Sequence, residues 1–99
     1  MKNLVGKKVI VRGDRSGVQY GEVISIENNV ISLKNSRRIW YWAGAASLSE
    51  LAEKGVKFPK NCKFSVTNTK SHYIFDVIEV IECTIVAVEN IEAVPVWTC

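Results

Sequence analysis

The sequence predicts an α+β fold of one domain: a small, SH3-like, partly open β-barrel built as a meander, with one short helix after the fourth strand and a further β-hairpin. Three observations support this prediction. Short β-branched runs alternate with Gly, Asn and Ser turn signals over the first 42 positions. The apolar period then becomes helical at residues 47–55, and two more β-rich segments follow.

The first two strands are expected at residues 9–11 and 18–27. A loop at residues 13–17, rich in glycine, separates them. Four apolar side chains of the second strand are expected on one face: Val18, Tyr20, Ile24 and Ile26. The alternation breaks at residues 22–23, which predicts a bulge near Gly21.

Two more strands complete the expected meander. The asparagines at residues 28–29 tolerate the left-handed conformations of a tight hairpin turn, so residues 30–34 are expected to form the return strand. Residues 35–36 are expected to form another short turn. Residues 37–42, Arg-Arg-Ile-Trp-Tyr-Trp, then make the fourth strand.

A short helix is expected to begin at Ser47. Ser47 and Glu50 have the spacing of a capping box, and Gly55 fits the C-terminal stop. Strands at residues 62–66 and 73–83 are expected to form the further hairpin. Residues 84–94 fit a helix by spacing and a strand by β-branched content, and Pro95 ends either element.

Composition predicts a single globular domain spanning residues 1–99. The chain is 47% hydrophobic and 23% charged. It contains no run of the roughly 20 apolar residues that a membrane span needs, and its start lacks the apolar segment of a signal peptide. We therefore expect a cytoplasmic protein without a membrane partner.

The sequence offers little for catalysis or metal binding. Its single histidine, His72, has no serine or cysteine nucleophile motif beside it. The three cysteines, Cys62, Cys83 and Cys99, have no metal-ligand spacing, so we expect reduced thiols, no metal and no cofactor. We also expect no enzymatic activity. The net charge of +3 leans weakly toward anionic partners.

The strand at residues 37–42 is the main candidate site. Alternation places Arg38, Trp40 and Trp42 on one face. Arg37 shares the other face with Ile39 and Tyr41, the last two suited to the core. A guanidinium beside indoles can pair with phosphate and stack on a base, although tryptophans also pack in cores or oligomer interfaces.

Two neighbouring segments extend this candidate. The small residues before the helix, including Gly44 and Ala45, would let a phosphate approach backbone N–H groups near Ser47, unless the capping box already uses them. The loop after Arg12, with Ser16 and Gly17, has the composition of an anion-binding backbone nest. A plain solvated loop is the alternative for that segment.

The motif Arg37-Arg38-Ile39-Trp40-Tyr41-Trp42, with Gly44-Ala45, Ser47-Leu48, Ser16-Gly17-Val18 and Pro95-Val96-Trp97, resembles a family of small bacteriophage and prophage proteins of uncharacterised function. The resemblance spans nearly the whole chain. It implies a phage product acting in the cytoplasm of an infected bacterium. It also favours a C-terminal helix at residues 84–93, and it brings no reaction or cofactor.

These features lead to one functional expectation and one alternative. We expect a homo-oligomeric binding protein that sequesters a small anionic nucleotide, such as a cyclic dinucleotide or an ADP-ribose derivative, and so counters host antiviral defence. The alternative is an SH3-like module that binds nucleic acid or protein. Ten residues are predicted to bind the ligand: Arg12, Ser16, Gly17, Arg37, Arg38, Trp40, Trp42, Gly44, Ala45 and Ser47.

Overall fold

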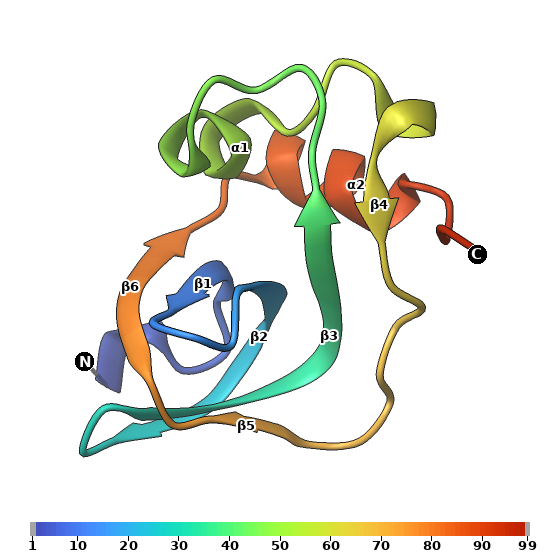
Figure 1. Cartoon of the computed structure of the whole chain (residues 1–99). Coiled ribbons are helices and arrows are strands. Elements are labelled where there is room, and N and C mark those ends of the chain that lie inside the picture. The colour runs from blue at the N-terminus through green and yellow to red at the C-terminus, as the bar shows by residue number, and fades with distance from the viewer. Residues whose placement is uncertain (1, 99) are drawn as a thin grey trace.

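A computed structural model describes residues 2–98, except for the side chain of residue 2. An antiparallel sheet and two short helices make up an α+β fold (Figure 1). The strands are β1 (Lys8–Gly13), β2 (Val18–Glu27), β3 (Val30–Tyr41), β4 (Lys63–Phe64), β5 (His72–Ile74) and β6 (Val77–Glu82). The α-helices are α1 (Leu48–Lys54) and α2 (Ile85–Ala93), and 3₁₀ turns span Lys2–Leu4 and Pro59–Asn61.

The sheet is open. Its order is β4-β3-β2-β1-β6, and β5 pairs with the first half of β3. The two sheet ends are connected by the chain, because β5 runs into β6 through Phe75 and Asp76. The expected SH3-like barrel is therefore not confirmed: the sheet curls, but hydrogen bonding does not close it.

The predicted turn at residues 35–36 is wrong, because β3 continues through it. Gly21 of β2 faces both Asn35 and Ser36 of β3, and Asn35 takes a left-handed conformation with φ 52°. The irregularity expected near Gly21 is thus present, with its extra residue in β3. The first half of the chain contains three strands, so α1 follows the third strand.

A second bulge reverses one predicted face of β2. The register shifts between Val23 and Ser25, whose partners in β3 are adjacent, so Ile24 is the extra residue. Val23 is buried and Ile24 is 40% exposed, which corrects the expected inward position of Ile24. The turn at residues 28–29 is confirmed by positive φ at both asparagines.

The further β-hairpin does not form. The segment expected to be one strand at residues 73–83 divides into β5 and β6, which pair with β3 and β1. The short β4 pairs with the second half of β3. The long, bulged β3 thus supplies an edge to both β4 and β5, so these two do not need to pair with each other.

Both helices begin with side-chain caps. The Ser47 hydroxyl accepts from the Glu50 N–H at 3.2 Å, and the Thr84 hydroxyl accepts from the Ala87 N–H at 3.1 Å. The helical interpretation of the C-terminal segment is confirmed by α2. None of the helices in the described part of the chain is long and apolar enough to cross a membrane.

The core consists of two apolar clusters divided by the sheet. Ile10 of β1 packs in the cluster beneath α1 and α2, together with Leu51 and Ile91. Its neighbours Val9 and Val11 belong to the other cluster, which lies within the curl of the sheet. β1 is consequently buried on both faces, and the helices fix the end of β3 that carries the candidate site.

Candidate functional site

The two adjacent arginines of β3 point to opposite sides of the sheet. Arg37 is only 3% exposed. Its Nε donates to the Ser65 carbonyl at 2.8 Å, its Nη1 donates to the Ile91 carbonyl at 2.9 Å, and its guanidinium lies 5.3 Å from the centre of the Phe64 ring. Burial lowers the pKa of Arg37. Arg37 therefore joins α2 to the sheet and does not lie on the candidate surface.

Arg38 and Trp40 do share an exposed surface, as predicted. They line an open cavity of about 230 Å³ with four polar residues, Ser36, Ser65, Asn68 and His72. Arg38 Nη1 donates to the Ser16 carbonyl at 2.6 Å, and the Arg38 N–H donates to Ser65 Oγ at 2.7 Å. Trp40 is 53% exposed. An arginine donor and an indole face are thus both available at this cavity.

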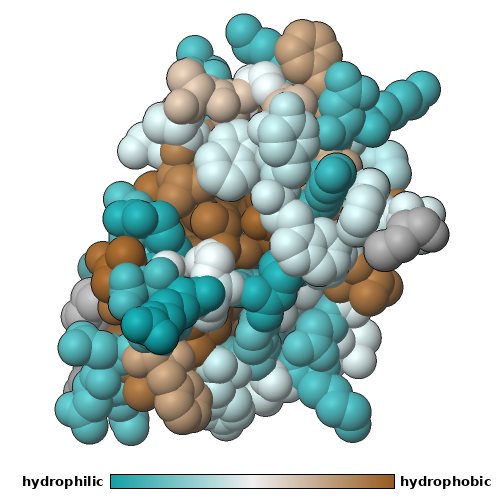
Figure 2. Space-filling model, in the orientation of Figure 1, coloured by the Kyte–Doolittle hydropathy of each residue, from teal (hydrophilic) through white to brown (hydrophobic). Residues whose placement is uncertain are grey.

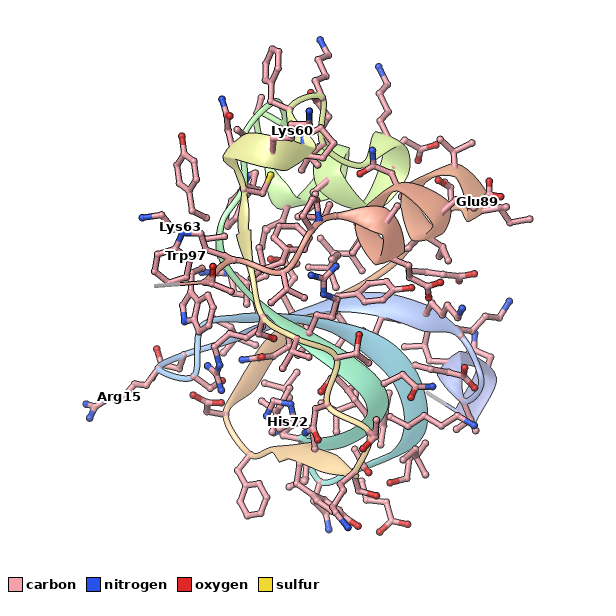
Figure 3. The ribbon with its side chains drawn as sticks, turned by 90° about the vertical axis from the view of Figure 1, so that its right-hand side faces the viewer. Arg15, Lys60, Lys63, His72, Glu89 and Trp97 are labelled. Atoms are coloured by element: carbon pink, nitrogen blue, oxygen red, sulfur yellow. The ribbon has the colours of Figure 1, made fainter. Side chains whose placement is uncertain are left out.

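Trp97 and Lys63 extend this surface in a way that the sequence did not predict. The Trp97 ring meets Trp40 edge to face with centroids 5.7 Å apart, and Lys63 Nζ lies 5.0 Å from the centre of the Trp97 ring. Figure 3 shows Lys63 and Trp97 on the side of the molecule that also carries Arg15. We call Arg38, Trp40, Lys63 and Trp97, with the cavity beside them, the Trp40 face.

The other two aromatic residues of the motif behave differently from the prediction. Tyr41 was expected in the core but is 52% exposed. The register of β3 against β4 shifts between Ile39 and Tyr41, which breaks the alternation at the strand end. Trp42 lies beyond the strand and packs against the core cluster beneath the helices. Trp42 is therefore not part of the Trp40 face.

A serine and a histidine meet inside the cavity. Ser36 Oγ lies 3.0 Å from His72 Nδ1. Burial and then the positive charge of Arg38 lower the pKa of His72, so its imidazole is neutral at neutral pH. The pair supplies uncharged polar atoms for a ligand. No local motif could reveal it, because the partners come from β3 and β5.

The predicted backbone nest exists, but a side chain of the protein fills it. One oxygen of the Asp76 carboxylate accepts from the N–H groups of Arg15 and Ser16 at 2.7 and 2.9 Å, and the other accepts from Ser16 Oγ at 2.7 Å. These bonds lower the pKa of Asp76 to about 2. The nest is consequently closed to a ligand anion while Asp76 stays in place.

Arg12 is also engaged, because its Nε pairs with Glu79 of β6 at 3.2 Å. Of the loop residues predicted to bind a ligand, only Ser16 and Gly17 approach the Trp40 face. Ser16 does so through its bond to Arg38. A Cβ on Gly17 would lie 4.0 Å from Arg38 Nη1.

The small-residue turn before α1 is packed against the protein. Gly44 has φ 94°, and a Cβ there would lie 2.6 Å from the backbone nitrogen of Lys57. Ala45 packs against the core cluster, and Ser47 already caps α1. This turn therefore does not contribute the backbone phosphate site that the sequence predicted.

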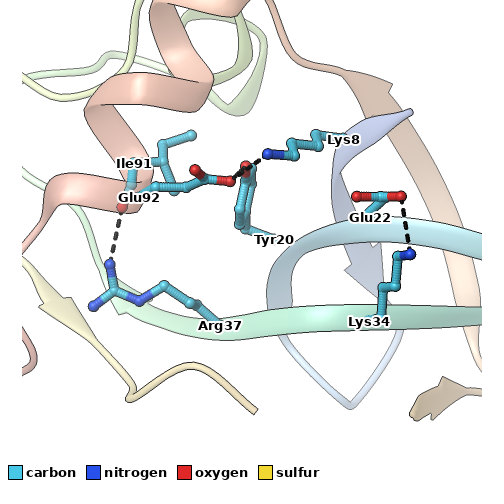
Figure 4. Close-up of polar contacts among 7 residues, drawn as sticks. All are labelled: Lys8, Tyr20, Glu22, Lys34, Arg37, Ile91 and Glu92. Atoms are coloured by element: carbon cyan, nitrogen blue, oxygen red, sulfur yellow. Dashed lines mark hydrogen bonds and ion pairs between the residues drawn. The ribbon is translucent and has the colours of Figure 1, made fainter. Parts of the chain in front are cut away.

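A second polar cavity, of about 280 Å³, lies at the C-terminal end of α2 (Figure 4). Glu92 accepts from Tyr20 at 2.6 Å and from Lys8 at 2.8 Å. Burial alone would raise the pKa of Glu92, but these hydrogen bonds and the charge of Lys8 lower it. Burial, and then the bond to Glu92, raise the pKa of Tyr20. The network satisfies its own charges.

Residues 2–98 contain no group of three or more His, Cys, Asp or Glu side chains arranged to hold a metal ion. Burial, then the charge of Glu82, raise the pKa of Cys83 to about 12, so its thiol remains protonated. Cys62 is a buried free thiol, and Cys99 lies outside the described residues.

Comparison with known proteins gives a family. Neither a curated protein nor a solved structure matches the chain. A family model described as "Domain of unknown function (DUF6948)" matches residues 6–91. Because that match covers most of the sequence, the chain belongs to the DUF6948 family.

Proposed function

We propose that the protein binds a nucleotide-derived molecule on the Trp40 face and sequesters it without converting it. The observation that carries the proposal is the pairing of Arg38 with Trp40 at one open cavity. Together with the resemblance to phage proteins, it supports a role in trapping a signal of host antiviral defence. Cyclic dinucleotides and ADP-ribose derivatives combine the bases and phosphates that such a site recognises.

The chemistry of the site suits both parts of a nucleotide. A base stacked on an exposed indole contributes about 1–3 kcal/mol, and Trp40 presents such an indole. The Arg38 guanidinium spends one Nη1 bond on the Ser16 carbonyl, and its other N–H groups remain for a phosphate. Ser36 and His72 add hydroxyl and imidazole atoms for hydrogen bonds to a ribose or a base edge.

Calorimetry with a ligand panel tests the proposal. The panel contains cyclic di-AMP, cyclic di-GMP, cyclic ADP-ribose and ADP-ribose, and at least one is expected to bind and quench tryptophan fluorescence. Trp40→Ala should abolish the quenching, whereas Trp42→Phe, a change in a core-packed side chain, should preserve it. If no member of the panel binds, the proposal fails. Mass spectrometry after denaturation should recover the bound ligand intact; a cleaved ligand would indicate an enzyme.

Oligomerisation belongs to the same proposal. Large apolar side chains are exposed outside the Trp40 face, among them Tyr73, Phe75, Ile78, Ile85 and Val86. Exposed apolar surface of this kind favours self-association when it is contiguous. Light scattering after size exclusion measures the assembly directly, and a monomer at micromolar concentration would refute this part.

Single-stranded nucleic acid is a second candidate, favoured by a row of lysines. Lys57, Lys60 and Lys63 recur every three residues, and the ion pairs found among the described residues include none of them. In Figure 3 the labelled Lys63, Trp97 and Arg15 lie on one side of the molecule and Lys60 lies at its top, whereas Glu89 lies on the opposite side. Surfaces that combine basic and aromatic side chains bind single strands, because the lysines follow the phosphate backbone and the bases stack on the rings.

Salt dependence separates the two candidates. Binding of a single-stranded nucleic acid releases counterions, so the affinity should fall steeply between 50 and 200 mM salt. The affinity should scale with the salt concentration to a power of roughly −0.7 for each phosphate contacted. A small ligand with one phosphate bound to Arg38 should lose only a few fold in affinity over the same range of salt. Lys60→Glu should lower the affinity for an oligonucleotide and leave the affinity for a cyclic dinucleotide unchanged. Glu89→Gln, on the opposite side of the molecule, is the control.

A further inference from the structure

Asp76 occupies an unusual position at the corner between β5 and β6. Its carboxylate accepts three hydrogen bonds from Arg15 and Ser16, and its own carbonyl accepts from the Asp14 N–H at 2.8 Å. The loop between β1 and β2 is thus wrapped around one acidic residue. Such an arrangement of N–H groups is what proteins use to bind external anions, so an internal carboxylate takes the place of a ligand.

This clamp continues to the Trp40 face through Ser16. The Ser16 carbonyl accepts from Arg38 Nη1 at 2.6 Å and from Gln19 Nε2 at 2.9 Å. The same residue is held on its other side by Asp76, through both its N–H and its hydroxyl. Three residues from three parts of the chain therefore form a connected series, Asp76, Ser16 and Arg38.

Gly13 packs closely against the clamp. A Cβ on Gly13 would lie 2.7 Å from Asp76 Oδ1 and would also collide with Ser16 Oγ. The loop and the carboxylate are thus in direct contact, and a larger residue at position 13 would displace the Ser16 and Asp76 side chains. A carbonyl held this firmly can fix the guanidinium that donates to it.

We propose that Asp76 is a positioning residue for phosphate recognition: by holding Ser16, it orients the Arg38 guanidinium toward the phosphate of the ligand. Asp76 itself does not touch the ligand. The inference rests on the proposed function, since it needs the phosphate to bind at Arg38. It assigns a role to the loop that the sequence had predicted to bind the anion directly.

The test compares a nucleotide with its nucleoside. Asp76→Ala removes the acceptor of all three side-chain hydrogen bonds that hold the loop, so the clamp opens. Affinity for ADP-ribose is expected to fall about tenfold, because an ionic hydrogen bond is misaligned, while affinity for adenosine stays within about twofold. Cyclic di-GMP and guanosine form a second probe pair. Glu79→Gln, three residues further along the chain and paired with Arg12, should leave all four affinities unchanged.

A double-mutant cycle excludes a merely structural effect. In an Arg38→Gln background, Asp76→Ala should cause no further loss of ADP-ribose affinity. The inference would be overturned if the affinities for nucleotide and nucleoside fell equally. It would also be overturned if the Asp76 substitution lowered ADP-ribose affinity as much in the Arg38→Gln background as in the wild type. If Asp76→Ala does not fold, Ser16→Ala removes only the hydroxyl bond to Asp76. It should still lower the affinity for the nucleotide by about threefold and leave the affinity for the nucleoside unchanged.

A ligand-free measurement keeps this inference separable from the proposed function. The Arg38 side-chain ¹⁵N resonances should show a restrained guanidinium in the wild type and faster motion in Asp76→Ala. If the wild type binds no nucleotide, the proposed function fails regardless of Asp76. If the wild type binds nucleotide but Arg38 is equally mobile in both proteins, only the inference about Asp76 fails.

Discussion

Arg37 and Arg38 are adjacent in β3 and lie on opposite faces of the sheet, where one stabilises the fold and the other lies at the open cavity. Arg37 is enclosed by α2, β4 and the Phe64 ring, and backbone carbonyls satisfy two of its donor nitrogens. Arg38 lies at an open cavity and keeps one bond to the Ser16 carbonyl. Residue type alone therefore does not identify a binding arginine; the elements packed over each face decide.

The buried side also shows how a charge is tolerated without a carboxylate. Arg37 Nη1 meets the Ile91 carbonyl near the C-terminal end of α2, where the helix dipole favours a cation. Its Nη2 has no hydrogen-bond partner among the described residues. The side chain is thus a structural cross-link whose desolvation is only partly compensated, whereas Arg38 remains available for a ligand.

Arg37→Ala should give the largest effect in this comparison. The change removes two hydrogen bonds and leaves a cavity beside Phe64, so the free energy of unfolding should fall by about 3 kcal/mol. Urea denaturation followed by circular dichroism measures it. A loss below about 1 kcal/mol would mean that Arg37 is dispensable for the fold and that the two sides of β3 are less different than they look.

Arg38→Ala should show the reverse pattern. A partly exposed arginine contributes little to stability, so the free energy of unfolding should change by less than about 1 kcal/mol. Affinity for a phosphate-bearing ligand should fall by about 2 kcal/mol, or roughly thirtyfold, because an ionic hydrogen bond is lost. Calorimetry and urea denaturation on the same preparation give both numbers, and a stability loss matching that of Arg37→Ala would contradict the assignment.

Trp40→Ala should weaken base binding by about tenfold, since one stacked base is lost. Trp42 offers the matched comparison within the same motif: Trp42→Ala should lower stability, because its ring packs on the core. Thermal unfolding and ligand titration of both variants test this division. If Trp42→Ala lowers only the ligand affinity and not the stability, Trp42 belongs to the Trp40 face and the present assignment is wrong.

The smallest expected effect concerns pH. The folded pKa of Asp76, about 2, lies below its ordinary value of 3.8. The clamp therefore stabilises the fold above about pH 4, and that contribution is lost as the pH falls toward 2. Asp76→Asn should flatten the stability profile between these values. An unchanged profile would show that the loop is held without the carboxylate.

The sequence allowed the α+β class, the asparagine turn, the helix that begins after Ser47 and the exposure of Arg38 and Trp40 to be predicted, since each depends on local chemistry. The residues of α2 fitted a helix and a strand equally, and only the resemblance favoured the helix. It did not reveal the bulges that extend β3 and expose Ile24, because a bulge reflects pairing with another strand. The Asp76 clamp and the Ser36–His72 contact join residues 36 to 61 positions apart. No pattern along the chain encodes such contacts.

The arrangement of β1 has a consequence for how the chain folds as it is made. β1 pairs with β2 on one edge and with β6 on the other, so Val9 has partners at Gly21 and at Glu82. The first pairing is local and forms fast; the second closes most of the chain and is slow. During synthesis, β1 keeps an open edge until β6 has emerged from the ribosome. The Asp76 clamp, and with it the orientation of Arg38, therefore forms only after residues 72–82 have been made.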